Sequence, residues 1–357
     1  MVQYLQDMAG LDDAIRVHML TAIEQQVFPG GVVGYIRDGA ARVLPFGTLT
    51  YQDNAPSVRA DTLYDLASAT KSVCTASVIL ALIEQGRLAL DDPVIWYVPE
   101  LVMAGREAIL IRHLLAFNAV FDLDQPLSSY AGEGSEALLH RIFATPLRYP
   151  PGSHFLYADI PYILLGIVAE RVCQTGLDEL ADTMFFDPLH MRHTTFRPRK
   201  LKAAQIAPTE VSNGQDIAYE PHDEKSRAFY RAGRVVGHAG LFSTAHDLLR
   251  FCQMILQDGE LDGRRYLTHE TISRMQTEIA GDSILGFSLG WTTRSSYMAG
   301  LPPGTFGKSG FTGTQVFISP NTHGCMVLLT NRTYPQRPKD SVAINNVKHT
   351  LAGLLLK

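Results

Sequence analysis

Ser68-Ala69-Thr70-Lys71 is the stretch of this chain best suited to chemistry, because it places a hydroxyl and an amine three residues apart. The alternating residues 62–66 before it and the apolar run 73–83 after it predict an extended segment, a turn and a buried helix beginning near Ser68. Residues three apart share a helix face, so the Lys71 amine can reach the Ser68 hydroxyl. Apolar surroundings disfavour an ammonium and the helix N-terminus favours an oxyanion, so the pair is a candidate activated nucleophile with Lys71 as base.

A serine–lysine pair at a helix start also has a structural interpretation, because serine is a common helix cap. Ser68 is the only serine with a lysine three residues on, but alone it fits that structural role better than catalysis. Two distant stretches favour catalysis: Tyr157-Ala158-Asp159 before a helix predicted near Tyr162, and Lys308-Ser309-Gly310 before a predicted strand.

The order and spacing of the three stretches resemble those of the serine β-lactamases and penicillin-binding proteins, whose signature is S-x-x-K, S-D-N and K-T-G. The tyrosine in the second motif is similar to the class C β-lactamase branch, with its related D-alanyl-peptidases and esterases. Residues 237–245 and 329–332 also look like the framework of that branch. The resemblance covers nearly the whole chain and implies a β-lactamase/transpeptidase-like fold.

The resemblance implies acyl transfer through a covalent ester on Ser68, with Lys71 and Tyr157 as bases and no metal or organic cofactor. The backbone N–H groups of Ser68 and Phe311 would form the oxyanion hole. Lys308 and Ser309 would bind a substrate carboxylate, and their positive field would lower the proton affinity of Lys71 and Tyr157. The implied substrate-binding residues are Asp159, Lys308, Ser309, Gly310 and Phe311.

Asp159 departs from the branch, which usually has an asparagine there. An ionised carboxylate only accepts hydrogen bonds, so it argues against ordinary recognition of a penicillin side-chain amide. It could favour a substrate with an N–H or ammonium group, or it could simply pair with Lys71 or Lys308. Both interpretations stay open at this point.

Two other features bear on the substrate. Residues 116–120 are apolar where relatives carry a polar turn, which predicts a reshaped pocket wall. Lys308 stands where many esterase-like relatives have histidine, which favours a small-molecule or peptide-like acyl substrate that bears a carboxylate.

Several histidines could be imagined as metal ligands, but no pair has the i, i+4 spacing of the metalloprotease helix. The candidates are His190, His193, His238 and the stretch His222-Asp223-Glu224. Loop structure or support of the site rim explains them better, and we place 222–224 near the cleft without a chemical role.

Composition limits the function classes. The 357 residues are 46% hydrophobic and 19% charged with a net charge of −5, which indicates an ordered globule without an electrostatic case for nucleic acid. The four cysteines form no C-x-x-C, so neither a disulfide framework nor a zinc knuckle is expected. The first residues lack a signal-peptide layout and no apolar run is long enough to span a bilayer, so we expect a cytoplasmic protein without a membrane span.

The elements that must hold the three motifs follow from periodicity. A helix over 9–26, a hairpin over 32–47 turning at Asp38-Gly39, strands over 285–291, 316–319 and 325–329, and a last helix over 340–356 are predicted. The middle is mostly helical, with a long polar stretch, 197–237, that we expect to lack regular structure and to wrap a site. The fold class is therefore α/β (α+β): an antiparallel sheet flanked by helices, formed by 1–70 and 265–357, with 71–264 inserted as a mostly helical domain and the active site at the interface.

Three functions fit this pattern. The first is a serine hydrolase acting on an amide, ester or β-lactam carbonyl, with water as acyl acceptor. The second is an acyltransferase of the same fold, in a biosynthetic pathway, that hands the Ser68 acyl group to an amine or alcohol. The third is a non-catalytic binding protein, which the intact Ser68, Lys71, Tyr157 and Lys308 disfavour.

Overall fold

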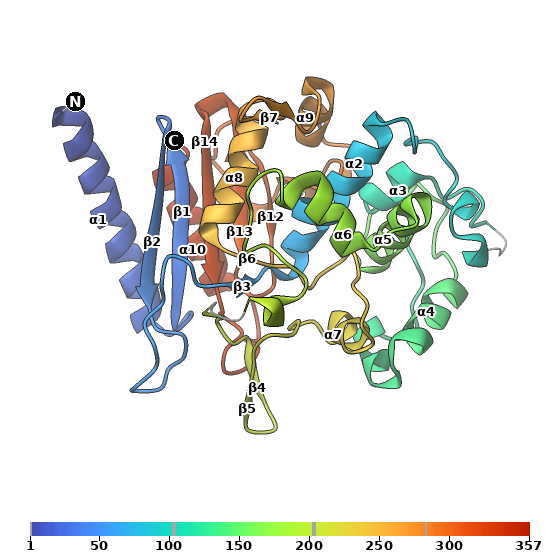
Figure 1. The fold of residues 1–357 in the computed structure, drawn as a ribbon, viewed down its shortest axis with the longest axis horizontal. Helices are drawn as coiled ribbons and strands as arrows, with labels where there is room; N and C mark the ends of the chain where they lie inside the picture. Colours follow the sequence, from blue (N-terminus) through green and yellow to red (C-terminus); the bar gives the residue numbers. More distant parts are fainter. Residues whose placement is uncertain (1, 102–104, 202–204, 283) are drawn as a thin grey trace.

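The computed structural model describes residues 2–101, 105–201, 205–282 and 284–357. An antiparallel sheet lies on one side of the molecule and a group of helices on the other (Figure 1). Its strand order is β2-β1-β14-β13-β12-β11-β10-β9. The sheet strands are β1 (Gly30–Arg37), β2 (Ala40–Gly47), β9 (Ala280–Gly281), β10 (Gly286–Phe287), β11 (Thr292–Arg294), β12 (Phe306–Ser309), β13 (Gln315–Ser319) and β14 (Gly324–Thr330).

Three short strand pairs lie outside this sheet, and ten α-helices are described. The pairs are β3 (Tyr64–Asp65) with β6 (Phe242–Ser243), β4 (Glu210–Ser212) with β5 (Gln215–Ile217), and β7 (Glu260–Leu261) with β8 (Arg264–Arg265). The helices are α1 (Val2–Glu24), α2 (Ser77–Glu84), α3 (Ile111–Leu115), α4 (Ser135–Ala144), α5 (Ile160–Cys173), α6 (Leu177–Ala181), α7 (Glu224–Arg231), α8 (Ala245–Leu256), α9 (His269–Gln276) and α10 (Val342–Leu355).

Strand β14 shows why the sheet is apolar on both faces. Cys325, Val327 and Leu329 join the core cluster that contains α8 and the central helices. Met326 and Leu328 point the other way, into the cluster formed with α1 and α10. Because alternate residues face opposite sides of a sheet and helices cover both, the strand reads as a continuous apolar run.

The predicted fold class is confirmed, and so are most of the predicted elements. The hairpin turns at Asp38-Gly39, where both residues have positive φ as a tight hairpin requires. Helix α1 begins earlier than predicted, at Val2. All four cysteines are free, and Cys173 is half-buried while the others are buried.

Two sequence expectations were wrong in detail. The strand predicted over 285–291 shrinks to β10, because Gly290 adopts a left-handed φ and passes so close to Ala76 that a Cβ would lie 2.5 Å from it. The polar stretch 197–237 is not structureless, since it contains the β4–β5 hairpin and α7. Helix α7 is capped at its N-terminus by Asp223, whose carboxylate accepts a hydrogen bond from the Ser226 backbone N–H.

The proposed domain boundaries at 70/71 and 264/265 stay a prediction. Helix α8, which falls inside 71–264, lies against the sheet rather than among the central helices (Figure 1). The helical segment Ala67–Glu84 is long and apolar enough to cross a membrane, which the sequence analysis did not anticipate. However, 83% of it is buried within the protein, as in the core helix of a globular fold.

We expect Gly237→Ala to lower the free energy of unfolding by about 1–3 kcal/mol, the usual effect of overpacking. A Cβ at this position would lie 2.3 Å from the Tyr162 carbonyl oxygen and 2.9 Å from Thr75 Oγ1. Urea unfolding curves would measure the change.

The matched control is Gly10→Ala in α1, where a Cβ meets nothing within 4 Å. This substitution should raise the free energy of unfolding by about 0.5–1 kcal/mol, because alanine is the better helix residue. Equal effects of the two substitutions would contradict the close approach at Gly237.

Candidate active site

Ser68 lies at a tight helix start held by a buried carboxylate. Ala67 has a φ of +46, unusual for a residue with a side chain, and its N–H donates to Asp65 at 2.7 Å. The other Asp65 oxygen accepts from the His222 N–H at 2.7 Å, and burial raises the pKa of Asp65 to about 6. Strain of this kind persists only where the surroundings enforce it, and it is common at functional sites.

The predicted helix beginning near Ser68 is confirmed, with an irregular first part. A 3-10 turn over Ala67–Ala69 runs into a π-helical segment over Lys71–Ala76 and then into α2. Single π turns inside helices are frequent at functional sites. Gly310 is required beside this start, because a Cβ there would lie 2.2 Å from the Leu66 carbonyl oxygen.

Lys71 lies beside Ser68 as predicted, and it joins three segments of the chain. Its Nζ donates to Ser68 Oγ at 3.1 Å, to Asp159 Oδ1 at 2.8 Å and to the His238 carbonyl oxygen at 2.9 Å. An ammonium has three N–H donors, so all of them are used. The alternative in which Asp159 pairs with a lysine is the one that the structure shows: of the two lysines considered the partner is Lys71, and Lys225 is a further one.

The expected low proton affinity of Lys71 is wrong. Burial alone would lower the pKa of Lys71, but the charge of Asp159 and the neighbouring Tyr157 outweigh it and raise the pKa above its ordinary value. Lys71 therefore rests as an ammonium. It must lose a proton before it can accept one from Ser68.

Lys308 is the lysine whose charge is disfavoured. Burial, followed by the like charge of Lys71, holds the pKa of Lys308 well below its ordinary value. Its Nζ has no hydrogen-bond partner among the described residues and lies 4.5 Å from the ring centre of Tyr157, 5.0 Å from Phe117 and 4.9 Å from Phe287. Phe117 belongs to the apolar turn 116–120, so that turn supplies part of the wall around Lys308.

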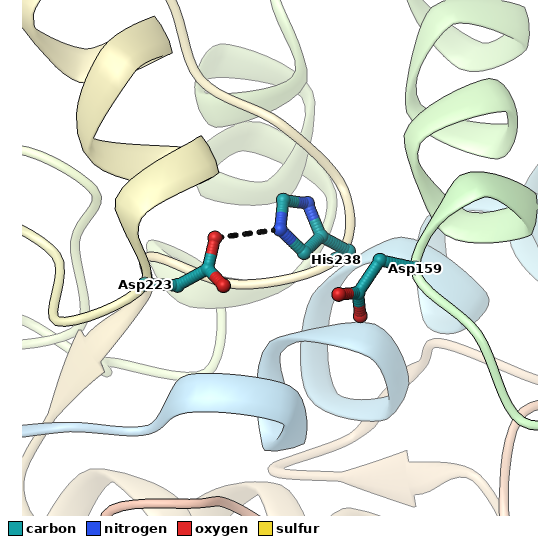
Figure 2. A group of neighbouring side chains, drawn as sticks. All are labelled: Asp159, Asp223 and His238. Carbon is teal, nitrogen blue, oxygen red and sulfur yellow. Dashed lines mark hydrogen bonds and ion pairs between the residues drawn. The ribbon is translucent and has the colours of Figure 1, made fainter. Parts of the chain in front are cut away.

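A further lysine, Lys225, compensates the negative charge of the carboxylates of Asp159 and Asp223. Figure 2 shows the side chains of Asp159, Asp223 and His238 close together. The Asp223 carboxylate is hydrogen-bonded to the His238 ring at 2.9 Å. Oxygen and nitrogen atoms of these three residues lie within 4.8 Å of one another, as metal ligands would. Lys225 Nζ, however, lies 2.6 Å from Asp223 and 3.3 Å from Asp159. With Lys71 and Lys225 both present, the two carboxylates have no uncompensated charge left for a divalent ion.

The remaining predicted site residues meet at one cavity of about 310 Å³. Of the predicted set, those that line it are Ser68, Tyr157, Lys308, Ser309, Gly310 and Phe311, while Lys71 and Asp159 lie behind Ser68. The Ser309 hydroxyl lies 2.9 Å from the Tyr297 hydroxyl and also hydrogen-bonds Gln315. The structure thus brings the three motifs together, and the individual roles stay predictions.

Sequence reasoning missed several charged residues of this region. Lys225 follows the stretch 222–224, which was placed near the cleft, but no local signal showed that its amine reaches Asp159. Arg332 and Lys348 also line the cavity, from the end of β14 and from α10. Residue types and spacing along the chain carry no trace of these long-range contacts.

Comparisons with known proteins agree with this geometry. A sequence profile described as "Beta-lactamase" matches residues 9–349. The chain is 33% identical over 306 residues to an Escherichia coli (strain K12) protein named "Putative D-alanyl-D-alanine carboxypeptidase", covering 76% of this chain and 70% of that protein. D-alanine carboxypeptidase AmpC from Burkholderia cenocepacia superposes with a TM-score of 0.76 at 21% identity, covering 97% and 99% of the two chains. EstCE1, "a hydrolase with promiscuous acyltransferase activity", superposes with a TM-score of 0.77 at 23% identity, covering 97% and 100%. These two structural likenesses show a shared fold.

We expect Asp159→Asn to lower the pKa of Lys71, because it removes the charge that raises this pKa. Neutral Lys71 would then be present at lower pH. Because the Lys71 ammonium can stabilise a Ser68 alkoxide through their hydrogen bond, the rate of Ser68 acylation by p-nitrophenyl acetate should begin to fall at lower pH than in the wild type.

The matched control is Asp53→Asn, which changes an exposed carboxylate far from the motifs in sequence and should leave the profile in place. A profile of Asp159→Asn that stays unchanged, or that moves to higher pH, would contradict the role of Asp159 in holding the proton on Lys71.

Proposed function

This chain belongs to the β-lactamase family, and from that we propose that it is a serine acyl-enzyme hydrolase of carboxylate-bearing, peptide-like substrates, with D-alanyl peptides the first class to test. The observation that carries the proposal is the position of Ser68. Its hydroxyl lies 3.1 Å from the Lys71 amine and opens on a cavity that Tyr157 and Lys308 also line. The proposed nucleophile, one proton-transfer group and an anion-binding group thus surround one space, and Lys71 contacts the nucleophile from outside the lining.

In the proposed reaction Ser68 Oγ attacks the substrate carbonyl and the bond to the leaving group breaks, which forms an ester. Tyr157 relays the proton, because Lys71 rests as an ammonium: its hydroxyl passes its own proton to the leaving group as it takes up the proton of Ser68. Lys71 stabilises the alkoxide as it forms, through its hydrogen bond to Ser68. Water then cleaves the ester and restores Ser68.

The preference for a carboxylate follows from Lys308. Burial disfavours its charge, and an arriving carboxylate would supply the missing partner and restore the ammonium. Among the described residues that line the cavity there is no aspartate or glutamate to compete for it. The relative from Escherichia coli is named for D-alanyl-D-alanine, a substrate that ends in a carboxylate.

We expect p-nitrophenyl acetate, or N-acyl-D-alanyl-D-alanine, to leave a covalent acyl group on the wild-type protein. Ser68→Ala should show no adduct by intact-mass spectrometry and should lose roughly a thousandfold or more of kcat/KM, as for other serine nucleophiles. Release of D-alanine would report turnover of the peptide.

Ser128→Ala, an exposed serine on the 3-10 segment Leu127–Glu133, is the control and should behave as the wild type. An adduct that persists in Ser68→Ala would rule out Ser68 as the nucleophile. A new ester or amide product, formed only when an alcohol or amine is added, would show the acyltransferase alternative instead.

A further inference from the structure

The cavity extends from Ser68 to helix α10, where a second buried lysine lines it. Lys348 lies on α10, is only 3% exposed and lines the cavity. Among the described residues it has no hydrogen bond or ion pair. Its Nζ lies over the ring of Tyr297, 5.7 Å from the ring centre. A buried lysine without a partner is unfavourable, and the usual structural remedy, a carboxylate, is missing.

The surroundings of Lys348 are positive and supply one further hydrogen-bond donor. Arg332 lines the same end of the cavity and is 7% exposed. Asn345 precedes Lys348 by three residues on α10, so the two side chains share the helix face that lines the cavity. Burial, followed by the charge of Arg332, lowers the pKa of Lys348 to about 7, which a bound anion would reverse.

A chain of contacts joins this end of the cavity to the reacting end. Lys308 is followed by Ser309, whose hydroxyl lies 2.9 Å from Tyr297, and the Tyr297 ring lies under Lys348. Lys308 contacts the rings beside Ser68, whereas the ring beneath Lys348 is that of Tyr297. The two lysines thus lie beside different rings of the same cavity, and a ligand with two negative groups would satisfy both.

We propose that Lys348 and Asn345 form a second anion subsite, which binds a carboxylate on the leaving-group side of the substrate. The leaving-group side is assigned because the subsite adjoins Ser309, where the proposed function places the terminal carboxylate of the substrate. The inference therefore rests on the proposed function and narrows it to acidic substrates, such as a peptide whose last residue is D-glutamate.

A carboxylate fits this subsite better than a phosphate. Each nitrogen of Arg332 already donates once within the protein: Nε to the Phe311 carbonyl at 2.8 Å, Nη1 to the Asp340 carbonyl at 3.0 Å and Nη2 to Ser341 Oγ at 3.1 Å. Three of its five N–H groups are thus committed to the fold, and we assign to Arg332 a favourable charge rather than the main contact. The ammonium of Lys348 and the amide of Asn345 match the two oxygens of a carboxylate.

The test compares two isosteric peptides, N-acyl-D-alanyl-D-glutamate and N-acyl-D-alanyl-D-glutamine, by calorimetry on the Ser68→Ala variant, which binds without turnover. We expect the glutamate peptide to bind roughly 10- to 100-fold more tightly, the range for a hydrogen bond to a charged group. Adding Lys348→Met should bring the ratio of the two dissociation constants close to unity, and Lys348→Arg should keep the preference.

Two further variants make the result specific. Asn345→Asp places a carboxylate beside Lys348 and should remove the preference for the glutamate peptide by pairing with the Lys348 amine. Lys200→Met removes a lysine charge at an exposed site, as the control for Lys348→Met, and should keep the preference. An unchanged ratio in Lys348→Met, or no preference in the Ser68→Ala protein, would overturn the subsite. The acetyl adduct on the wild-type protein, formed from a neutral ester, reports the proposed function independently of this outcome.

Discussion

The ammonium of Lys71 is the interaction on which the site depends. Its three hydrogen bonds join the helix start at Ser68, the segment around Asp159 and the loop carbonyl of His238, which are far apart in the sequence. A fully buried charge is tolerated only when its partners are complete, so each of these segments is fixed by the same requirement. The position of Ser68 is therefore set by electrostatics as well as by packing.

Lys71 and Lys308, which both lie over the Tyr157 ring, differ in protonation because their surroundings differ. Lys71 has a carboxylate partner and keeps its proton, whereas Lys308 has only aromatic neighbours and is held toward the neutral form. Pairs of titratable groups whose surroundings push their pKa values apart are typical of acid–base sites. Because Asp159 makes Lys71 a poor proton acceptor at rest, the proposed reaction gives the proton transfer to Tyr157 and leaves Lys71 to stabilise the Ser68 alkoxide.

The predictable parts of this protein are those set by short-range patterns. The Ser68–Lys71 contact follows from helix spacing, and the strands around β14 follow from their apolar runs. The strand over 285–291 was wrong because the approach of Gly290 to another helix cannot be seen locally. Lys225 and Lys348 were missed for the same reason, since a lysine becomes functional only through partners that the fold supplies, or withholds, from distant segments.

Under the proposed function, selectivity in this site comes from leaving charges unpaired rather than from adding contacts. Phe117, in the apolar turn 116–120, is part of the aromatic wall that denies Lys308 a polar partner, and Lys348 is left with a single ring. A neutral ligand would leave both amines desolvated, whereas an anion restores the ionised form that burial disfavours. An aspartate or glutamate in the lining would remove this difference. The absence of both from the described lining of the cavity is therefore a condition for the proposed recognition of acidic substrates.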